Sequence, residues 1–127
     1  MTSPHLANAE LAVMEVLWDE DRVTARAIRD RLYPDATKAQ HGTVQRLLQR
    51  LEDKGFVKRD RSLPVHLFQA VISRESYASG QLESLADKLT GGSIAPLLTH
   101  LVENDRISER EIESLRRILE KKREAGS

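Results

Sequence analysis

The chain of 127 residues is 39% hydrophobic but only 4% aromatic, and its 20 basic and 20 acidic side chains give a formal net charge of zero. That length suits one ordinary domain with a small helical addition and excludes a second large domain. The lack of Cys excludes disulfides, cysteine nucleophiles and thiolate metal sites. The most apolar early stretch, residues 11–18, contains Glu15 and is too short to cross a bilayer, so we expect a cytoplasmic protein without membrane insertion.

Two short helices are predicted near the N-terminus. Apolar residues at helical spacing predict the first over about residues 9–18, with Asn8 as its N-cap. Thr24 is expected to cap the second, and Tyr33-Pro34 ends it because the residue before a proline disfavours the helical conformation. The side chains of this second helix expected to point inward are Ala27, Ile28 and Leu32.

The clearest helical pattern lies around residues 44–51. Apolar residues at i, i+3, i+4 and i+7 form a single stripe that faces a core: Val44, Leu47, Leu48 and Leu51. Gly55 is expected to end this helix. The rest of its surface carries only glycine and polar residues: Gly42, Thr43, Gln45, Arg46, Gln49 and Arg50. We therefore expect this helix to pack through its leucines and to present hydrogen-bonding side chains outward.

A β-hairpin is predicted next, with strands over residues 56–59 and 65–69 and a turn-compatible, basic connection over 60–64. Ser73 then opens a long helix with heptad-like spacing, which Gly91-Gly92 ends. A further apolar stripe follows over residues 94–102 and breaks at Asn104-Asp105.

The start of the last helix is well specified. Ser108 and Glu111 stand three residues apart, as in a capping box, and Ile107 and Ile112 occupy the positions of a hydrophobic staple. Glu113 and Arg117 have the spacing and order of a helical ion pair.

Three helices followed by a hairpin are the order of a winged helix-turn-helix, so we predict a mainly α fold with a small β-hairpin. We assign residues 1–72 to this DNA-binding domain and 73–127 to a helical dimerisation domain. Charge supports DNA as the partner: eleven Lys and Arg residues between Arg22 and Arg61 stand against five Asp and Glu, an excess of six positive charges.

The third helix of this motif enters the major groove, which assigns roles to its outer side chains. Arg46 and Gln45 can reach base edges, whereas Arg50, Arg59 and Arg61 suit phosphates, and Thr24 leaves helix N-terminal amides free for a phosphate. The predicted DNA-binding residues are Thr24, Gln40, His41, Thr43, Gln45, Arg46, Arg50, Arg59 and Arg61.

The helices after Ser73 would expose a large apolar surface in a monomer, and a self-complementary dimer covers it. The predicted interface residues are Leu82, Leu85, Leu89, Leu97, Leu98, Leu101, Val102, Ile112, Leu115, Ile118 and Leu119. The simpler alternative is that these stripes fold back on the winged domain as core.

Other functions stay open at this stage. The same architecture serves protein-binding adaptors without DNA affinity, and a repressor of this type can be released by a small ligand. Neither catalytic motifs nor metal-ligand spacing is present, and His5, His41, His66 and His100 match no ligand pattern, so we expect no enzyme activity, no cofactor and no metal site.

Three runs resemble the penicillinase-repressor (BlaI/MecI/CopY) family: residues 11–18, 23–26 and 42–55. The similarity continues through 73–77 and 108–113. It implies a dimeric repressor of a dyad-symmetric operator whose C-terminal helices interlock with those of a partner. It also implies release through a membrane sensor with a zinc protease that cleaves the dimerisation region.

The chain departs from that family at three points. Gly42 stands where several relatives carry Lys, and the clustered C-terminal cysteines of copper-responsive members are absent. The bond between His100 and Leu101 is the candidate cleavage site, in place of the Asn-Phe bond cut in antibiotic-resistance members.

Overall fold

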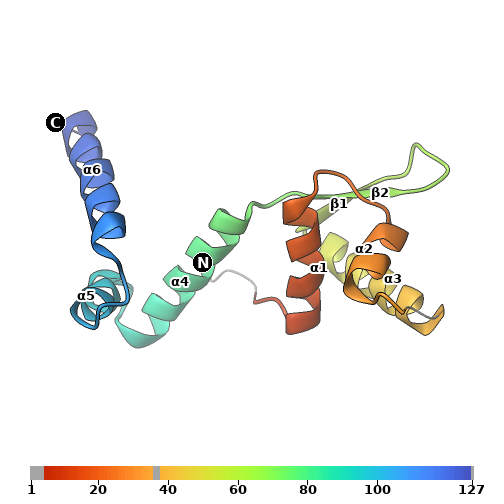
Figure 1. Cartoon of the computed structure of the whole chain (residues 1–127), viewed down its shortest axis with the longest axis horizontal. Coiled ribbons are helices and arrows are strands. Elements are labelled where there is room, and N and C mark those ends of the chain that lie inside the picture. The colour runs from red at the N-terminus through yellow and green to blue at the C-terminus, as the bar shows by residue number, and fades with distance from the viewer. Residues whose placement is uncertain (1–4, 36–37, 127) are drawn as a thin grey trace. The chain divides into compact units, whose positions relative to one another are not determined.

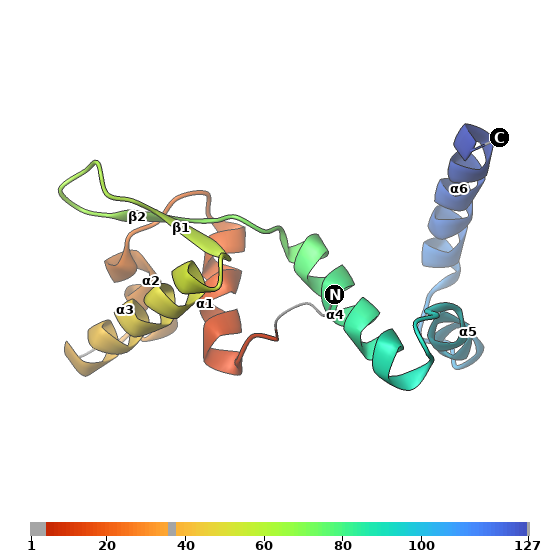
Figure 2. The same ribbon diagram turned by 180° about the vertical axis from the view of Figure 1, so that it is seen from behind.

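The computed structural model describes residues 5–35 and 38–126, and it divides into two compact units, one ending at Gln81 and the other beginning at Leu82 (Figures 1 and 2). Within the described residues, the first unit contains three complete helices, an antiparallel hairpin and the beginning of a fourth helix. The hairpin packs on α1 (Asn8–Asp19) and α3 (Lys38–Asp53), and α2 (Ala25–Leu32) packs on both of these helices. This arrangement is the predicted winged helix-turn-helix.

The bounds of the first two helices lie within one residue of those that the sequence predicts, but the cap of α1 differs. Its N-cap is Ala7, not Asn8, and the backbone N–H of Ala7 donates to Glu10 Oε1 at 2.9 Å. The prediction of Thr24 as the cap of α2 is confirmed, because Thr24 Oγ1 accepts from the Ala27 N–H at 3.1 Å. Ala27 itself is exposed, which makes its inward assignment wrong, whereas Ile28 is buried.

Helix α3 buries all four residues of its predicted apolar stripe. Its C-terminus is closed by two backbone bonds, from Phe56 N–H to the Leu51 carbonyl at 2.9 Å and from Gly55 N–H to the Glu52 carbonyl at 3.0 Å. This pair of bonds requires a left-handed residue after the helix, and Gly55 has φ of 82°. Phe56, the next residue, is thereby turned into the core.

The hairpin consists of β1 (Val57–Asp60) and β2 (Leu67–Ala70), paired from Val57 opposite Ala70 to Asp60 opposite Leu67. Both strands begin later than predicted, by one residue and two residues. The Phe56 N–H is engaged by the end of α3, so pairing starts after it. Val23, just before α2, adds a bridge to Phe68 through two backbone bonds of 2.7 and 3.1 Å, which extends the sheet beyond the two predicted strands.

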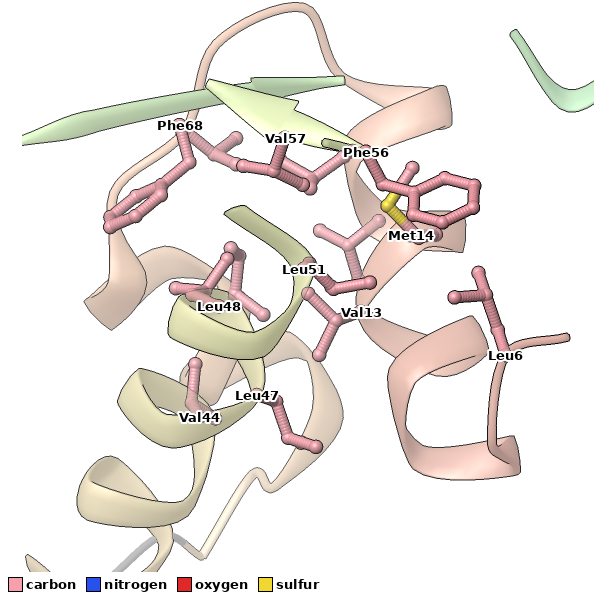
Figure 3. Close-up of a cluster of buried hydrophobic side chains, with 14 of the residues drawn as sticks. Leu6, Val13, Met14, Val44, Leu47, Leu48, Leu51, Phe56, Val57 and Phe68 are labelled. Carbon is pink, nitrogen blue, oxygen red and sulfur yellow. The ribbon is translucent and has the colours of Figure 1, made fainter. Parts of the chain in front are cut away.

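The core of the first unit lies where α1, α3 and the hairpin meet, and Figure 3 shows side chains from all three converging there. It also includes Tyr77 from α4 (Arg74–Leu89), whose hydroxyl accepts from the Leu6 N–H at 3.0 Å. The Tyr77 ring lies against Trp18 and Phe56, with centroids 6.1 and 5.9 Å away. The first turn of α4 is therefore part of the packing of the winged unit.

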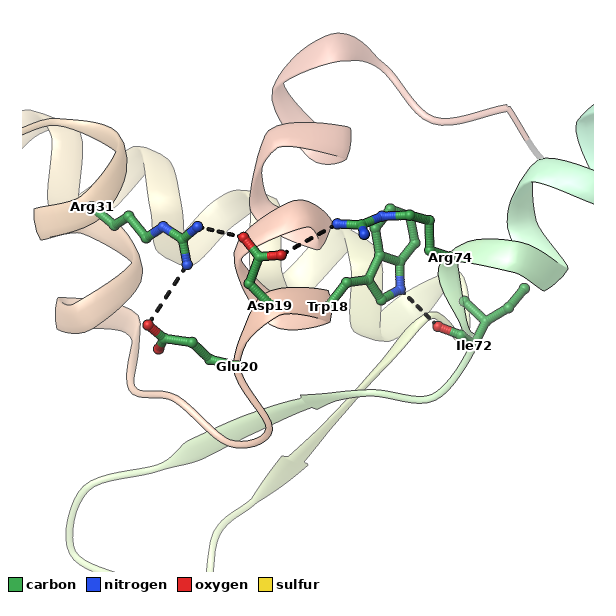
Figure 4. A network of polar contacts seen from close by, with 6 residues as sticks. All are labelled: Trp18, Asp19, Glu20, Arg31, Ile72 and Arg74. Atoms are coloured by element: carbon green, nitrogen blue, oxygen red, sulfur yellow. Dashed lines mark hydrogen bonds and ion pairs between the residues drawn. The ribbon is translucent and has the colours of Figure 1, made fainter. Parts of the chain in front are cut away.

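A polar network fastens the end of α1 to its neighbours (Figure 4). Trp18 Nε1 donates to the Ile72 carbonyl at 2.9 Å, and the Arg74 guanidinium lies 5.4 Å from the centroid of the Trp18 ring. Asp19 accepts from Arg31 and, at 3.4 Å, from Arg74. The hydrogen bond from Arg31 holds the pKa of Asp19 below its ordinary value.

The second unit contains the end of α4, α5 (Ala95–Glu103) and α6 (Glu109–Gly126). Ser73 caps α4 by accepting from the Ser76 N–H, as predicted, and Gly91 and Gly92 follow that helix with positive φ. The predicted capping box of α6 is confirmed by two bonds of 3.1 Å that join Ser108 and Glu111 in both directions. Hydrogen bonds from the backbone N–H and the side chain of Ser108 to its carboxylate lower the pKa of Glu111.

The expected ion pair on α6 is also present, with Arg117 Nε 3.7 Å from Glu113 Oε1. Between residues 5 and 126, apart from 36 and 37, no helix has the length and apolar character needed to span a membrane.

Candidate nucleic-acid interface

The surface of α3 opposite its leucines is polar along its length, as the sequence predicts. Gln45, Arg46, Gln49 and Arg50 are exposed, and Gln40, His41 and Thr43 are half-buried. Arg46 Nη2 donates to Thr43 Oγ1 at 3.2 Å, and Thr43 donates to the Ala39 carbonyl at 3.1 Å. The first of these bonds holds the Arg46 guanidinium beside its own helix.

A cleft of about 620 Å³ opens along one side of α3, toward α2 and the hairpin. Residues from α2 and its cap, from α3, from both strands and from the loop between them line it: Thr24, Ala25, Arg26, His41, Gln45, Gln49, Arg59, Pro64, Val65, His66 and Phe68. The structure thus brings four predicted DNA-binding residues to one place, although they come from three separate parts of the sequence. These four are Thr24, His41, Gln45 and Arg59.

Arg50 lies toward α1, away from the cleft. Its charge acts on Glu10, which is only 3% exposed and whose two carboxylate oxygens accept from Lys54 Nζ at 2.9 and 2.8 Å. Burial alone would raise the pKa of Glu10. The hydrogen bonds from Lys54 and Ala7, with the charges of Lys54 and Arg50, outweigh that effect and lower it. Arg46, Thr43 and Gln40 are not among the residues that line the cleft.

Two hairpin arginines meet the end of α3 at Glu52. Arg61 Nη2 donates to Glu52 Oε1 at 3.0 Å, and Arg59 Nε lies 3.7 Å from the same oxygen. The Arg59 guanidinium also lies 4.7 Å from the centroid of the Phe68 ring. These contacts hold the end of β1 against Glu52 of α3, with the Arg61 side chain half-exposed and the Arg59 side chain largely buried.

The acidic residue of the hairpin is already engaged within the protein. Asp60 accepts from the hydroxyl and N–H of Ser62 and from Arg22 Nη2 at 2.6 Å, and these bonds lower its pKa. The negative charge of Asp60 is therefore matched by Arg22, and the carboxylate that faces Arg59 and Arg61 is that of Glu52.

Three polar residues of the cleft were not among the predicted site residues: Arg26, Gln49 and His66. Two of them had a signal in the sequence. Arg26 lies in the first turn after the Thr24 cap, and Gln49 follows Gln45 by one helical turn. His66 had none, because its place depends on where the hairpin loop lies relative to α3.

Comparison with known proteins gives a consistent result. The sequence profile of the family described as penicillinase repressor matches residues 6–121. The transcriptional regulator BlaI of Mycobacterium tuberculosis is 33% identical over 116 residues, covering 90% of this chain and 82% of that protein. The penicillinase repressor of Bacillus licheniformis is 27% identical over 117 residues, 92% of this chain and 91% of that protein.

A solved structure, the DNA-binding domain of the repressor BlaI in solution, is 23% identical, covers 61% of this chain and 94% of that one, and superposes with a TM-score of 0.48. The family profile spans most of the sequence, so the chain belongs to the penicillinase repressor family, whose members are DNA-binding transcriptional repressors.

Proposed function

We propose that this chain represses transcription by binding a dyad-symmetric DNA operator as a homodimer, with α3 in the major groove. The observation that carries the proposal is the exposed outer face of α3, which is polar and cationic and stands beside a cleft lined by Arg26 and Arg59. A helix that docks on a protein needs exposed apolar anchors, and this face offers hydrogen-bonding groups instead. That difference favours DNA over an adaptor function.

The proposed contacts fall into two classes. Arg46 and Gln45 are exposed on α3 and read base edges, Arg by two bonds to guanine and Gln by two bonds to adenine. Arg50, Arg59 and Arg61, with the N-terminus of α2 at Thr24, contact phosphates and set affinity and register. Gln40, His41 and Thr43 complete the surface near the start of α3.

The homodimer is proposed from the second unit, in which most of the large apolar side chains are exposed. Most of the predicted interface residues are between 39% and 67% exposed: Leu82, Leu85, Leu89, Leu98, Leu101, Val102, Leu115, Ile118 and Leu119. Leu97 and Ile112 are half-buried. An apolar groove of about 470 Å³ between α5 and α6 runs along Leu98, Val102 and Leu115. A second copy would remove this surface from water.

We further propose that repression ends by cleavage near the bond between His100 and Leu101, through a membrane sensor protease. This bond lies inside α5, and the His100 carbonyl accepts from the backbone N–H and the side-chain Nδ2 of Asn104 at 3.1 and 2.8 Å. Proteases bind extended substrates, so local opening of α5 must precede the cut. Mass spectrometry of the protein from induced cells tests this: fragments ending near His100 support cleavage, and intact protein during full derepression excludes it.

The test of the proposed function is a titration of the full chain against duplex DNA from upstream of its own gene, with sedimentation to determine the stoichiometry. We expect two chains per symmetric site and much weaker binding when one half-site is scrambled, because two linked contacts reinforce each other. Equal binding to intact and half-scrambled sites would contradict the dimeric arrangement. No binding to any duplex would favour the adaptor.

A further inference from the structure

Two of the four histidines line the cleft beside α3: His41 from the helix and His66 from the hairpin loop. The other two lie elsewhere. His5 Nδ1 is 3.1 Å from Gln81 Oε1, and the ring of His100 lies next to Asn104 in α5. The cleft therefore gathers the histidines that stand closest to the proposed DNA surface.

The cleft also contains side chains with unmet hydrogen-bonding capacity. His41 Nδ1 and Arg59 Nε are both shielded from solvent, and neither has a hydrogen-bond partner among the residues that the structure describes. For Arg59 Nε the nearest acceptor given is Glu52 Oε1, at 3.7 Å and beyond bonding distance. Shielded polar atoms are nearly always paired in folded proteins, so each of these two residues of the cleft lining lacks a hydrogen bond that its type usually makes.

Charge specifies the kind of partner. Arg26 contributes a cation from α2 and Arg59 one from β1, and His41 and His66 are the other titratable groups facing the cleft. No carboxylate belongs to the cleft lining in the described ranges; Glu52, on α3, faces Arg59 from outside that lining. A guanidinium can only donate hydrogen bonds, so the ligand that this cleft suits is an acceptor and, in this setting, an anion.

We propose that the cleft holds a backbone phosphate of the bound duplex and that His41 and His66 contact it in their protonated form. DNA binding would then take up protons, and affinity would rise as the pH falls. This inference rests on the proposed function and extends it by naming a phosphate site and its dependence on pH.

DNA affinity would depend on pH because a phosphate in the cleft favours the charged form of the two histidines. A phosphodiester keeps its negative charge throughout the physiological range, whereas histidine is the side chain that gains or loses its charge between about pH 5 and 8. A protonated imidazole donates from both nitrogens and attracts the phosphate, while a neutral ring donates from only one. Each proton taken up on binding changes the DNA affinity by up to about tenfold per pH unit.

The experiment measures the affinity of the full chain for one operator duplex at about pH 6 and about pH 8, at constant ionic strength. The test variant combines His41→Gln with His66→Gln, and the matched control combines His5→Gln with His100→Gln. We expect wild type and control to bind at least about tenfold more tightly at the lower pH, and the test variant to lose most of that difference. Wild type, test variant and control differ only at histidines, so all their other titrating groups are the same.

A test variant that keeps the full pH dependence overturns the proposal. Wild-type binding of equal strength at both pH values also overturns it, but leaves the proposed DNA binding intact. Absence of wild-type binding at either pH overturns the proposed function and this inference together. Should the test variant fail to fold, imidazole NMR signals of the wild-type chain decide. When DNA is added, these signals must show that the rings of His41 and His66 stay protonated to a higher pH than in the free protein. Titration curves that DNA leaves unchanged refute the site.

Discussion

Lys54, immediately after α3, binds both carboxylate oxygens of Glu10 on α1 at 2.8 and 2.9 Å, and this ion pair joins α1 to the end of α3. Glu10 is 3% exposed, while the Lys54 side chain remains 38% exposed. Breaking a buried pair from one side leaves a charge without its partner. Because Lys54 is partly solvated, we expect Lys54→Met to lower the free energy of unfolding by about 1–3 kcal/mol at neutral pH.

The same pair predicts how stability depends on pH. The pKa of Glu10 is lower in the folded chain than its ordinary value of 4.5. The contribution of the ionised Glu10 to the free energy of unfolding is therefore complete above pH 4.5. It is lost as the pH falls through the lower, folded value. Denaturant titrations between about pH 6 and pH 3 should show Glu10→Gln losing less stability on acidification than wild type. Glu15→Gln, an exposed change on the same helix, is the control and should follow wild type.

Tyr77 predicts where the chain can be shortened. A truncation after Gln81 keeps the Tyr77 hydroxyl that accepts from Leu6, whereas a truncation after Val71 removes it with its ring contacts. Losing a buried aromatic side chain costs about 3–5 kcal/mol. Thermal melting should show the longer fragment folded and the shorter one far less stable. Equal stability of the two fragments would mean that α4 contributes nothing to the winged unit.

Leu115 tests the proposed dimer. Leu115→Asp places a charge on the exposed apolar face of α6 and should convert the chain to a monomer in sedimentation experiments, with the fold retained. Leu63→Asp is a matched control, since Leu63 is exposed to a similar extent, 46% against 41%, but lies in the hairpin loop. If both variants sediment as wild type does, the interface lies outside α6.

Arg46 and Arg61 separate base contacts from phosphate contacts. Arg46→Ala should cost about 1–3 kcal/mol of binding and relax preference at one base position, because Arg46 stands exposed on α3. Arg61→Ala should weaken binding to all sequences by a similar factor, because Arg61 lies on the hairpin. Competition against duplexes with single base changes measures both. A sequence-independent loss from Arg46→Ala would show that another face of α3 enters the groove.

The sequence predicts the helices and the polar face of α3 because these depend on local spacing. The stripe from Val44 to Leu51, the Thr24 cap and the Ser108 capping box each involve residues within two turns of one another, and all three are confirmed. Contacts between distant segments carry no such signal. The Val23 bridge to Phe68 and the burial of Tyr77 in the winged core depend on tertiary packing.

The division at residues 72 and 73 stays a prediction about function, while the compact units divide nine residues later. The position of Arg50 shows the same limit within the site. Helical spacing places it on the polar surface of α3, but only the packing of α1 reveals that its charge acts on Glu10. Of the predicted DNA-binding residues, the four that meet in the cleft do so because α2 and β1 pack against α3, which no local pattern specifies.

The salt dependence of DNA affinity tests the central claim most directly, because phosphate contacts release counterions in proportion to the charges that they neutralise. With Arg50, Arg59 and Arg61 on phosphates in each of two chains, the logarithm of affinity should fall against the logarithm of salt with a slope of about −5. Arg61→Ala removes one phosphate contact from each of the two chains, so it should reduce the magnitude of that slope by about 2. A slope near zero, or one that Arg61→Ala leaves unchanged, would contradict the assignment of this surface to DNA.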